Sequence, residues 1–207
     1  MIEITGVSAL HRSLTRVIVR DMGGIEVTNG ASVSFDNVTI ESSSNGLTVD
    51  TSSSATITSC TFDDNDGTGL SHSGSGSITG VTANGNGGDG ISAGGFALAG
   101  LTVSRNGGNG ITAASCSGCT AEDNGGTGIS AASSCVSCTA EGNGGSGITA
   151  SSCTSCTAEG NDGTGISAGS LDECRIIGNG AGITGATTVQ NSLVANNAEH
   201  AGDREFG

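Results

Sequence analysis

The densest group of side chains that could do chemistry is Asp63-Asp64-Asn65-Asp66. Carboxylates that converge from one bend can hold a hard cation such as Ca²⁺, which prefers oxygen ligands. Two carboxyl groups at a suitable separation can instead act as the acid and the base of a glycoside hydrolase. Asp63, Asp64 and Asp66 are therefore the predicted ligands of a Ca²⁺ or Na⁺ ion, and no organic cofactor is expected. They also mark the acidic site of an alternative, enzymatic reading.

Cysteines form the second group, and six of the eight stand in three CxxC pairs: Cys116/Cys119, Cys135/Cys138 and Cys153/Cys156. Such pairs are found in zinc and redox sites. The aligned positions elsewhere carry Ile57/Cys60, Ile78/Val81 and Leu98/Leu101. A cysteine that takes turns with Ile, Leu and Val is a small core hydrophobe, so packed thiols are favoured over a metal. Disulfides between neighbouring strands stay open, because a strand spacing of about 4.8 Å is within reach of a bridge.

His72 is the third candidate, since a histidine can serve as an acid or a base. It aligns with Val27, Val49 and Ala93. That alignment predicts a packed ring or an edge residue, so no residue is assigned a catalytic role.

A repeat must position all these residues. The phrase reads NDGTGL at 65, NGGDGI at 86, NGGNGI at 106, NGGTGI at 124, NGGSGI at 143 and NDGTGI at 161, at spacings of 21, 20, 18, 19 and 18 residues. Repeats of this length that are rich in Gly, Ser and Thr indicate stacked β-coils. Aligned on the Asn, the chain shows apolar columns that must point inward. The predicted core includes Ile91, Ile111, Ile129, Ile148, Ile166, Cys119, Cys138 and Cys156.

Each coil also alternates with period two, as in Cys119-Thr120-Ala121-Glu122, which predicts strands with one buried face. Stacked in register, such strands are parallel. The pattern resembles the right-handed β-helix repeats of the pectin-lyase-like superfamily over roughly residues 15–197. The resemblance implies an all-β, single-domain solenoid of about nine coils of 17–23 residues. Residues 1–14 are expected to be a cap or attachment segment, and residues 198–207 a tail.

The resemblance also bears on activity. Enzymes of that superfamily use paired carboxylates, or Ca²⁺ with an Arg base, and carry NTD, GHG and RIK elements that this chain lacks. The repeated asparagines are instead expected to stack as an amide ladder. Its central members are Asn106, Asn124, Asn143 and Asn161.

One flat face is expected to be polar. A threonine column runs beside a mostly acidic column that includes Glu122, Glu141 and Glu159. The plain interpretation is a solvated sheet, which is favoured. Binding of a glycan or packing against a symmetry mate are the alternatives, and the acidic neighbours argue against ice.

The net charge of the chain limits the classes of binding partner that can be expected. The chain has 20 acidic residues against six basic ones, all arginine, for a net charge of -14. Halophilic adaptation and a GC-rich genome explain this equally well. The absence of a basic stripe makes a nucleic-acid partner unexpected. No long apolar run predicts membrane insertion, and the N-terminus does not read as a signal peptide.

Together these observations favour a non-enzymatic structural or adhesive module. The predicted role is a virion spike, fibre or capsid decoration protein, at a virion or extracellular surface, that offers its polar face to a host surface or glycan. A homotrimer is the expected assembly, with other virion proteins meeting the N-terminal segment. The alternative is a small polysaccharide hydrolase or lyase that acts near Asp63–Asp66.

Overall fold

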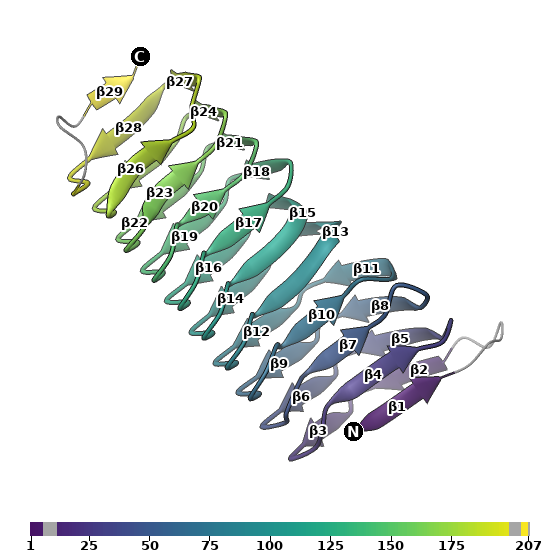
Figure 1. The fold of residues 1–207 in the computed structure, drawn as a ribbon. Helices are drawn as coiled ribbons and strands as arrows, with labels where there is room; N and C mark the ends of the chain where they lie inside the picture. Colours follow the sequence, from purple (N-terminus) through teal and green to yellow (C-terminus); the bar gives the residue numbers. More distant parts are fainter. Residues whose placement is uncertain (6–11, 199–203, 207) are drawn as a thin grey trace.

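The computed structural model describes residues 1–5, 12–198 and 204–206, and over this part the chain winds as a parallel β-helix (Figure 1). The described residues form strands and turns and no helix, so none of them provides a helix that could cross a bilayer. All strand pairs but the last are parallel, and they keep their register except for one shift between Ala93 and Ala97 of β13. The predicted fold is therefore confirmed.

Three faces surround the core. Face A is formed by β1 (Ile2–Thr5), β4 (Ile25–Thr28), β7 (Leu47–Val49), β10 (Leu70–His72), β13 (Ile91–Ala99), β15 (Ile111–Ser117), β17 (Ile129–Ala131), β20 (Ile148–Thr149), β23 (Thr164–Ser167) and β26 (Ala181–Thr184). Face B is formed by β2 (Arg12–Thr15), β5 (Ser32–Asp36), β8 (Ser54–Thr58), β11 (Ser75–Thr79), β18 (Ser134–Val136), β21 (Ser152–Thr154), β24 (Ser170–Asp172) and β27 (Thr188–Gln190). The long strands β13 and β15 extend onto face B, because β15 pairs with both β17 and β18.

Face C carries the candidate site. It is formed by β3 (Ile18–Arg20), β6 (Thr39–Glu41), β9 (Thr61–Asp63), β12 (Thr82–Asn84), β14 (Thr102–Ser104), β16 (Thr120–Glu122), β19 (Thr139–Glu141), β22 (Thr157–Glu159), β25 (Arg175–Ile177), β28 (Ser192–Ala195) and β29 (Arg204–Phe206).

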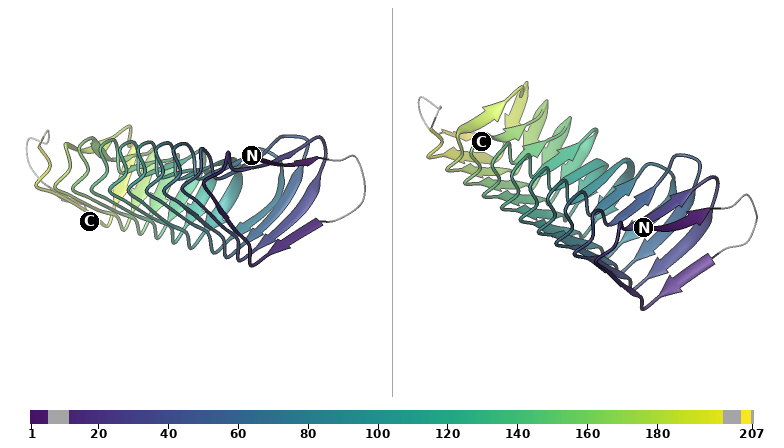
Figure 2. Two further views of the ribbon diagram at one scale, coloured as in Figure 1. Left: turned by 90° about the horizontal axis from the view of Figure 1, so that it is seen from below. Right: turned by 60° about the horizontal axis from the view of Figure 1, so that its bottom comes forward.

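The coils shorten along the axis. Ile2 pairs with Ile25 and Ile166 with Ile183, so a coil shrinks from 23 residues (25 − 2) to 17 (183 − 166). In one buried column Phe62 gives way to Ala121 and Ala140 in the middle coils, and larger side chains return at Ile176 and Val194. The coils near the N-terminus are visibly the wider ones (Figure 2).

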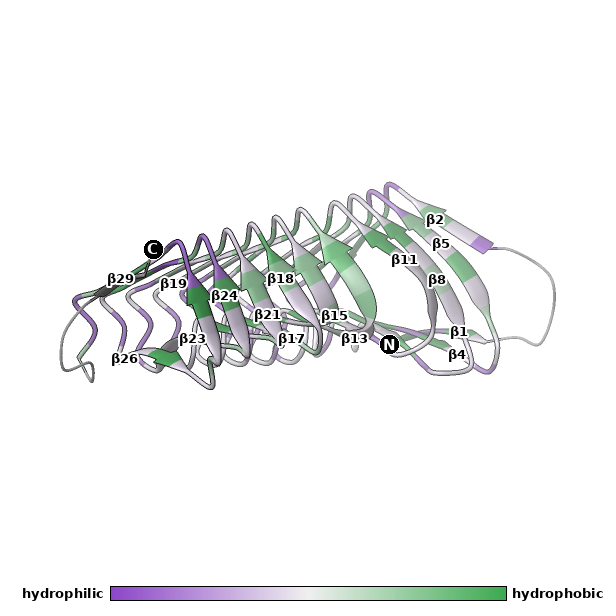
Figure 3. Ribbon diagram, turned by 90° about the horizontal axis from the view of Figure 1, so that it is seen from above, coloured by the Kyte–Doolittle hydropathy of each residue, from purple (hydrophilic) through white to green (hydrophobic). Residues whose placement is uncertain are grey.

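The core is a set of apolar columns. The isoleucines from Ile91 to Ile166 in the predicted column are all fully buried, and burying such a side chain stabilises the fold by roughly 1.5–3 kcal/mol. Apolar residues recur at matching places on neighbouring strands (Figure 3).

The strands at both ends extend beyond residues 15–197, the range in which the β-helix was expected. β1 lies within residues 1–14, β2 begins there and ends at Thr15, and the two strands pair with β4 and β5, so coil strands begin before residue 15. Residues 6–11 of the expected cap lie outside the described part. At the other end, β29 adds an antiparallel strand to β28.

The bends explain much of the composition. Each described coil has at least two residues with positive φ, for instance Ser137 (52°) and Gly142 (65°). The glycines that directly follow ladder asparagines do not have positive φ. Gly107 has an ordinary φ, but a Cβ there would stand 2.3 Å from the carbonyl oxygen of Gly87 in the coil below. Close stacking requires these glycines.

Candidate functional site

Face C presents two columns of polar side chains to the outside. Its strands alternate, so Ala121 and Ala140 point inward while the residues on either side point outward. The hydroxyl column consists of Thr39, Thr61, Thr82, Thr102, Thr120, Thr139 and Thr157, and each is the register partner of the next. The acidic column beside it consists of Glu41, Asp63, Asn84, Ser104, Glu122, Glu141 and Glu159. The face is thus a regular array of threonine hydroxyl groups beside a column of carboxylates that Asn84 and Ser104 interrupt.

Among the described residues, arginines form ion pairs with the acidic column only at its two ends. Arg20 forms an ion pair with Glu41, and Arg175 forms one with Glu159. Within the described chain, Asp63, Glu122 and Glu141 have no ion-pair partner. The middle of the face is therefore negative, with adjacent strands about 4.8 Å apart.

The three predicted metal ligands are not brought together. Asp63 lies on face C, half-buried, and its Oδ1 accepts hydrogen bonds from the backbone N and the Nδ2 of Asn84 at 3.0 and 3.1 Å. Asp64 and Asp66 are exposed in the bend that follows, Asp64 with a positive φ. Among the residues that the structure describes, no three His, Cys, Asp or Glu side chains converge as metal ligands do.

Asp63 nevertheless has a perturbed carboxyl group. Burial raises its pKa, and the hydrogen bonds from Asn84 offset part of that rise. The nearby charges of Asp64 and Glu41 raise the pKa further. A carboxyl group with a raised pKa beside a second carboxylate is an arrangement that can serve acid–base catalysis.

His72 is a buried core residue. Its ring packs against Phe96 with centroids 4.4 Å apart. Its Nδ1 accepts a hydrogen bond from the Gly74 N–H at 3.2 Å, and Nε2 faces the Ala55 carbonyl oxygen at 3.4 Å. These partners favour the neutral ring protonated on Nε2, and desolvation lowers the pKa of His72.

All eight cysteines are buried free thiols. Cys116, Cys135 and Cys153 are successive register partners. The Cys156 thiol lies 3.4 Å from the carbonyl oxygens of Cys135 and Thr154. Burial raises the pKa of Cys60. The structure thus has these residues in the core as thiols.

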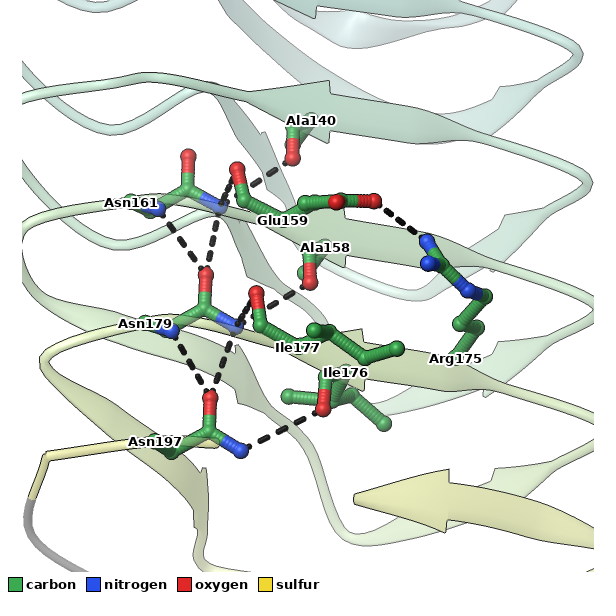
Figure 4. A network of polar contacts seen from close by, with 9 residues as sticks. All are labelled: Ala140, Ala158, Glu159, Asn161, Arg175, Ile176, Ile177, Asn179 and Asn197. Atoms are coloured by element: carbon green, nitrogen blue, oxygen red, sulfur yellow. Dashed lines mark hydrogen bonds and ion pairs between the residues drawn. The ribbon is translucent and has the colours of Figure 1, made fainter. Parts of the chain in front are cut away.

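The asparagines form a continuous buried ladder (Figure 4). Asn161 donates from Nδ2 to the Oδ1 of Asn179 at 2.8 Å, and its backbone N donates to the same oxygen at 3.0 Å. Its Nδ2 also donates to the carbonyl oxygen of Ala140 at 3.1 Å. The same pattern joins Asn65, Asn86, Asn106, Asn124, Asn143, Asn161, Asn179 and Asn197.

Sequence reasoning missed the head of this ladder. The backbone N of Ser43 donates to the Oδ1 of Asn65, so a serine takes the asparagine position one coil earlier. Its place 22 residues before Asn65 was the available signal. It also missed Phe96, whose contact with His72 follows from a register shift between Ala93 and Ala97 in β13.

A recess lies near the C-terminal end of the glycine-rich bends. It holds about 200 Å³ and is lined by Asp162, Gly163, Thr164, Gly180 and Ala181. It contains none of the sequence-predicted site residues.

Comparison with known proteins gives one family. The family model described as "Right handed beta helix region" matches residues 2–98 and 23–199. Neither the curated proteins nor the solved structures include a significant match. These findings concern the fold and leave the activity open.

Proposed function

Because the chain belongs to the right-handed β-helix family, we propose that it is a non-enzymatic structural or adhesive module whose binding surface is face C. The observation that carries the proposal is the register of the hydroxyl and carboxylate columns over seven successive strands, β6 to β22. A rigid array of this kind suits an extended ligand with repeating hydroxyl groups, such as a surface glycan, because each coil offers a threonine hydroxyl beside a second polar side chain, which is a carboxylate in five coils and Asn84 or Ser104 in the other two.

In its finer form, the proposal is a spike, fibre or capsid decoration protein of a virion, with a homotrimer as the assembly. The elongated shape of the helix supports this form (Figure 1). Immunolabelled electron micrographs of particles test the location, and sedimentation at low and molar salt tests the trimer.

Binding by face C is tested with two matched variants. One replaces Thr120, Thr139 and Thr157 with Ala on face C, and the other replaces Ser130, Thr149 and Ser167 with Ala on face A of the same coils. Retention is measured on a panel of immobilised neutral and amino-sugar polysaccharides. The face C variant is expected to lose about tenfold in affinity, or ~1.4 kcal/mol, while the face A variant binds as the parent does. Equal binding by both variants, or no binding by the parent, would refute this function.

The second candidate is a polysaccharide hydrolase or lyase, which the raised pKa of Asp63 beside Glu41 favours. Reducing-sugar release and unsaturated-product absorbance from acidic polysaccharides test it, with Asp63→Asn as the variant. Turnover that Asp63→Asn abolishes would replace the binding proposal with the enzymatic one.

A further inference from the structure

The chain contains nine Asn-Gly pairs, a sequence with an intrinsic reaction. They begin at Asn29, Asn45, Asn84, Asn86, Asn106, Asn109, Asn124, Asn143 and Asn179. The nitrogen of the glycine, on losing its proton, can attack the Cγ of the asparagine side chain, forming the new N–Cγ bond while the Cγ–Nδ2 bond breaks and the side-chain NH2 takes up a proton and leaves as ammonia. Water then opens the cyclic imide to aspartate or isoaspartate. The net reaction consumes one water and releases one ammonia, with no oxidant or reductant.

The fold restrains eight of these nine glycine nitrogens in the same way. Each donates its N–H to a backbone carbonyl oxygen of a neighbouring coil at 2.7–3.0 Å: Gly46, Gly85, Gly87, Gly107, Gly110, Gly125, Gly144 and Gly180. A nitrogen held in a stacked backbone hydrogen bond cannot turn toward the adjacent side chain without breaking that bond.

The side chains of the ladder asparagines are restrained as well. The Asn143 amide, for example, donates to Asn161 Oδ1 at 2.9 Å and to the Ala121 carbonyl at 3.1 Å, and its oxygen accepts from Asn124. Both reacting groups are thereby held by coils above and below. The product would also be disfavoured, because it would place a buried carboxylate opposite carbonyl oxygens.

Asn29-Gly30 is the exception. The Gly30 N–H is held by the Oγ of Ser52, a side-chain hydroxyl, at 3.1 Å. The side-chain amide of Asn29 has a single long bond, from Nδ2 to Thr28 Oγ1 at 3.4 Å. Both residues are exposed with positive φ, in the turn between β4 and β5, and no atom lies within 4 Å of a Cβ built on Gly30.

We propose that Asn29-Gly30 is the site at which the folded chain deamidates spontaneously, and that the stacked backbone protects the other eight pairs until the helix unfolds. The modification adds a negative charge beside Asp50, whose Oδ2 accepts from the Asn29 backbone N at 3.2 Å. Unfolding would convert ladder asparagines to carboxylates and so make the loss of structure irreversible.

The test is incubation at mildly alkaline pH, once in native buffer and once in urea, followed by peptide mass spectrometry that separates asparagine, aspartate and isoaspartate. Native protein is expected to be modified at Asn29 at least tenfold faster than at any other pair. In urea all nine pairs should react. Asn29→Gly, which suits a positive φ, should abolish the native reaction, whereas Asn45→Ser should leave it unchanged.

A third variant probes the restraint itself. Ser52→Ala frees the Gly30 N–H, so it should accelerate the reaction at Asn29 and at no other pair. Equal native rates at Asn29 and the ladder asparagines, or an Asn29 rate that Ser52→Ala leaves unchanged or lowers, would overturn the proposal.

Discussion

Whether a polar side chain can be buried in this molecule depends on the hydrogen-bond partners that the neighbouring residues and coils supply. The column of His72 carries valine in the two preceding coils, Val27 and Val49, yet the ring fits because Gly74 and Ala55 supply its hydrogen-bond partners. The repeat pattern of the sequence does not predict these hydrogen-bond partners. A sequence can therefore predict that His72 faces inward, but not which tautomer the core selects.

Acid should destabilise the fold through His72. Its pKa is lowered in the folded state by desolvation, while the unfolded side chain titrates near ~6.5. Below that value the unfolded chain binds more protons than the folded chain, so stability falls as the pH drops from about 6.5 toward the folded pKa. His72→Val should flatten the urea-unfolding free energy between about pH 7 and pH 5. A slope unchanged by the substitution would contradict this assignment.

The ladder should not tolerate a charge that a bend accepts. Asn143→Asp replaces a donor with a carboxylate that faces Asn161 Oδ1 and the Ala121 carbonyl, so a loss of about 3 kcal/mol or more is expected. Asn109→Asp is the matched control, because the Asn109 Oδ1 only accepts, from the Thr127 N–H. It adds a carboxylate near Asp89, whose Oδ1 accepts from the Asn109 N–H at 2.7 Å, so a smaller loss of under about 1 kcal/mol is expected. Chemical denaturation measures the free energy of unfolding of both variants. Equal losses of stability would show that the ladder hydrogen bonds do not make a special contribution to the fold.

At the scale of the strand, columns rather than residues set the behaviour. The CxxC pairs illustrate this, since their spacing alone suggests a metal, whereas their columns belong to the core. The turn positions between strands were harder to foresee. Ser137, Asp123 and Gly142 all have positive φ. Because three residue types share this conformation, the residue type alone does not predict which bend positions have positive φ.

The thiol columns should be chemically silent in the folded protein. A thiol-alkylating reagent is expected to label few of the eight cysteines until urea is added, when all should react. Val136→Cys supplies an exposed reference thiol on β18, since Val136 is 40% exposed, and it should be labelled at once. Stoichiometric zinc in the purified protein, or labelling of Cys135 as fast as the reference, would show that the core interpretation is wrong.

The acidic column should make stability depend on salt. Glu122 and Glu141 are register partners without an ion pair, and like charges directly opposite each other cost roughly 0.2–1 kcal/mol. Salt screens this repulsion, so the melting temperature should rise with NaCl. Replacing both with Gln should raise the melting temperature at low salt and reduce its salt dependence. A response to Ca²⁺ far below the effective Na⁺ concentration would instead indicate a specific site, to be sought first near Asp63.

For the whole molecule, the repeat made the fold predictable, and the features that could not be predicted are those that the repeat does not include. Every column from Leu47 to Ile166 follows from spacing, because each coil can bury its apolar face only against its neighbours. The first coil lacks the Asn-Gly phrase, so the contribution of β1 and β2 was not foreseen. The dispersal of Asp63, Asp64 and Asp66 was equally hidden, since adjacent positions on a bend leave in different directions.

If each coil is an independent repeat, one can be removed in register. Deletion of residues 125–143 joins Asn124 to Gly144 and leaves every column continuous, because Asn124 and Asn143 differ by one coil. The shortened chain should stay folded, with the same β-sheet circular dichroism per residue and a urea m-value lower in proportion to the surface lost. Deletion of residues 125–134 removes only part of the coil and takes Ile129 from its column, so it should expose the core and unfold the neighbouring coils. If both deletions unfold the protein alike, stability is not the sum of coil and interface terms that a solenoid requires.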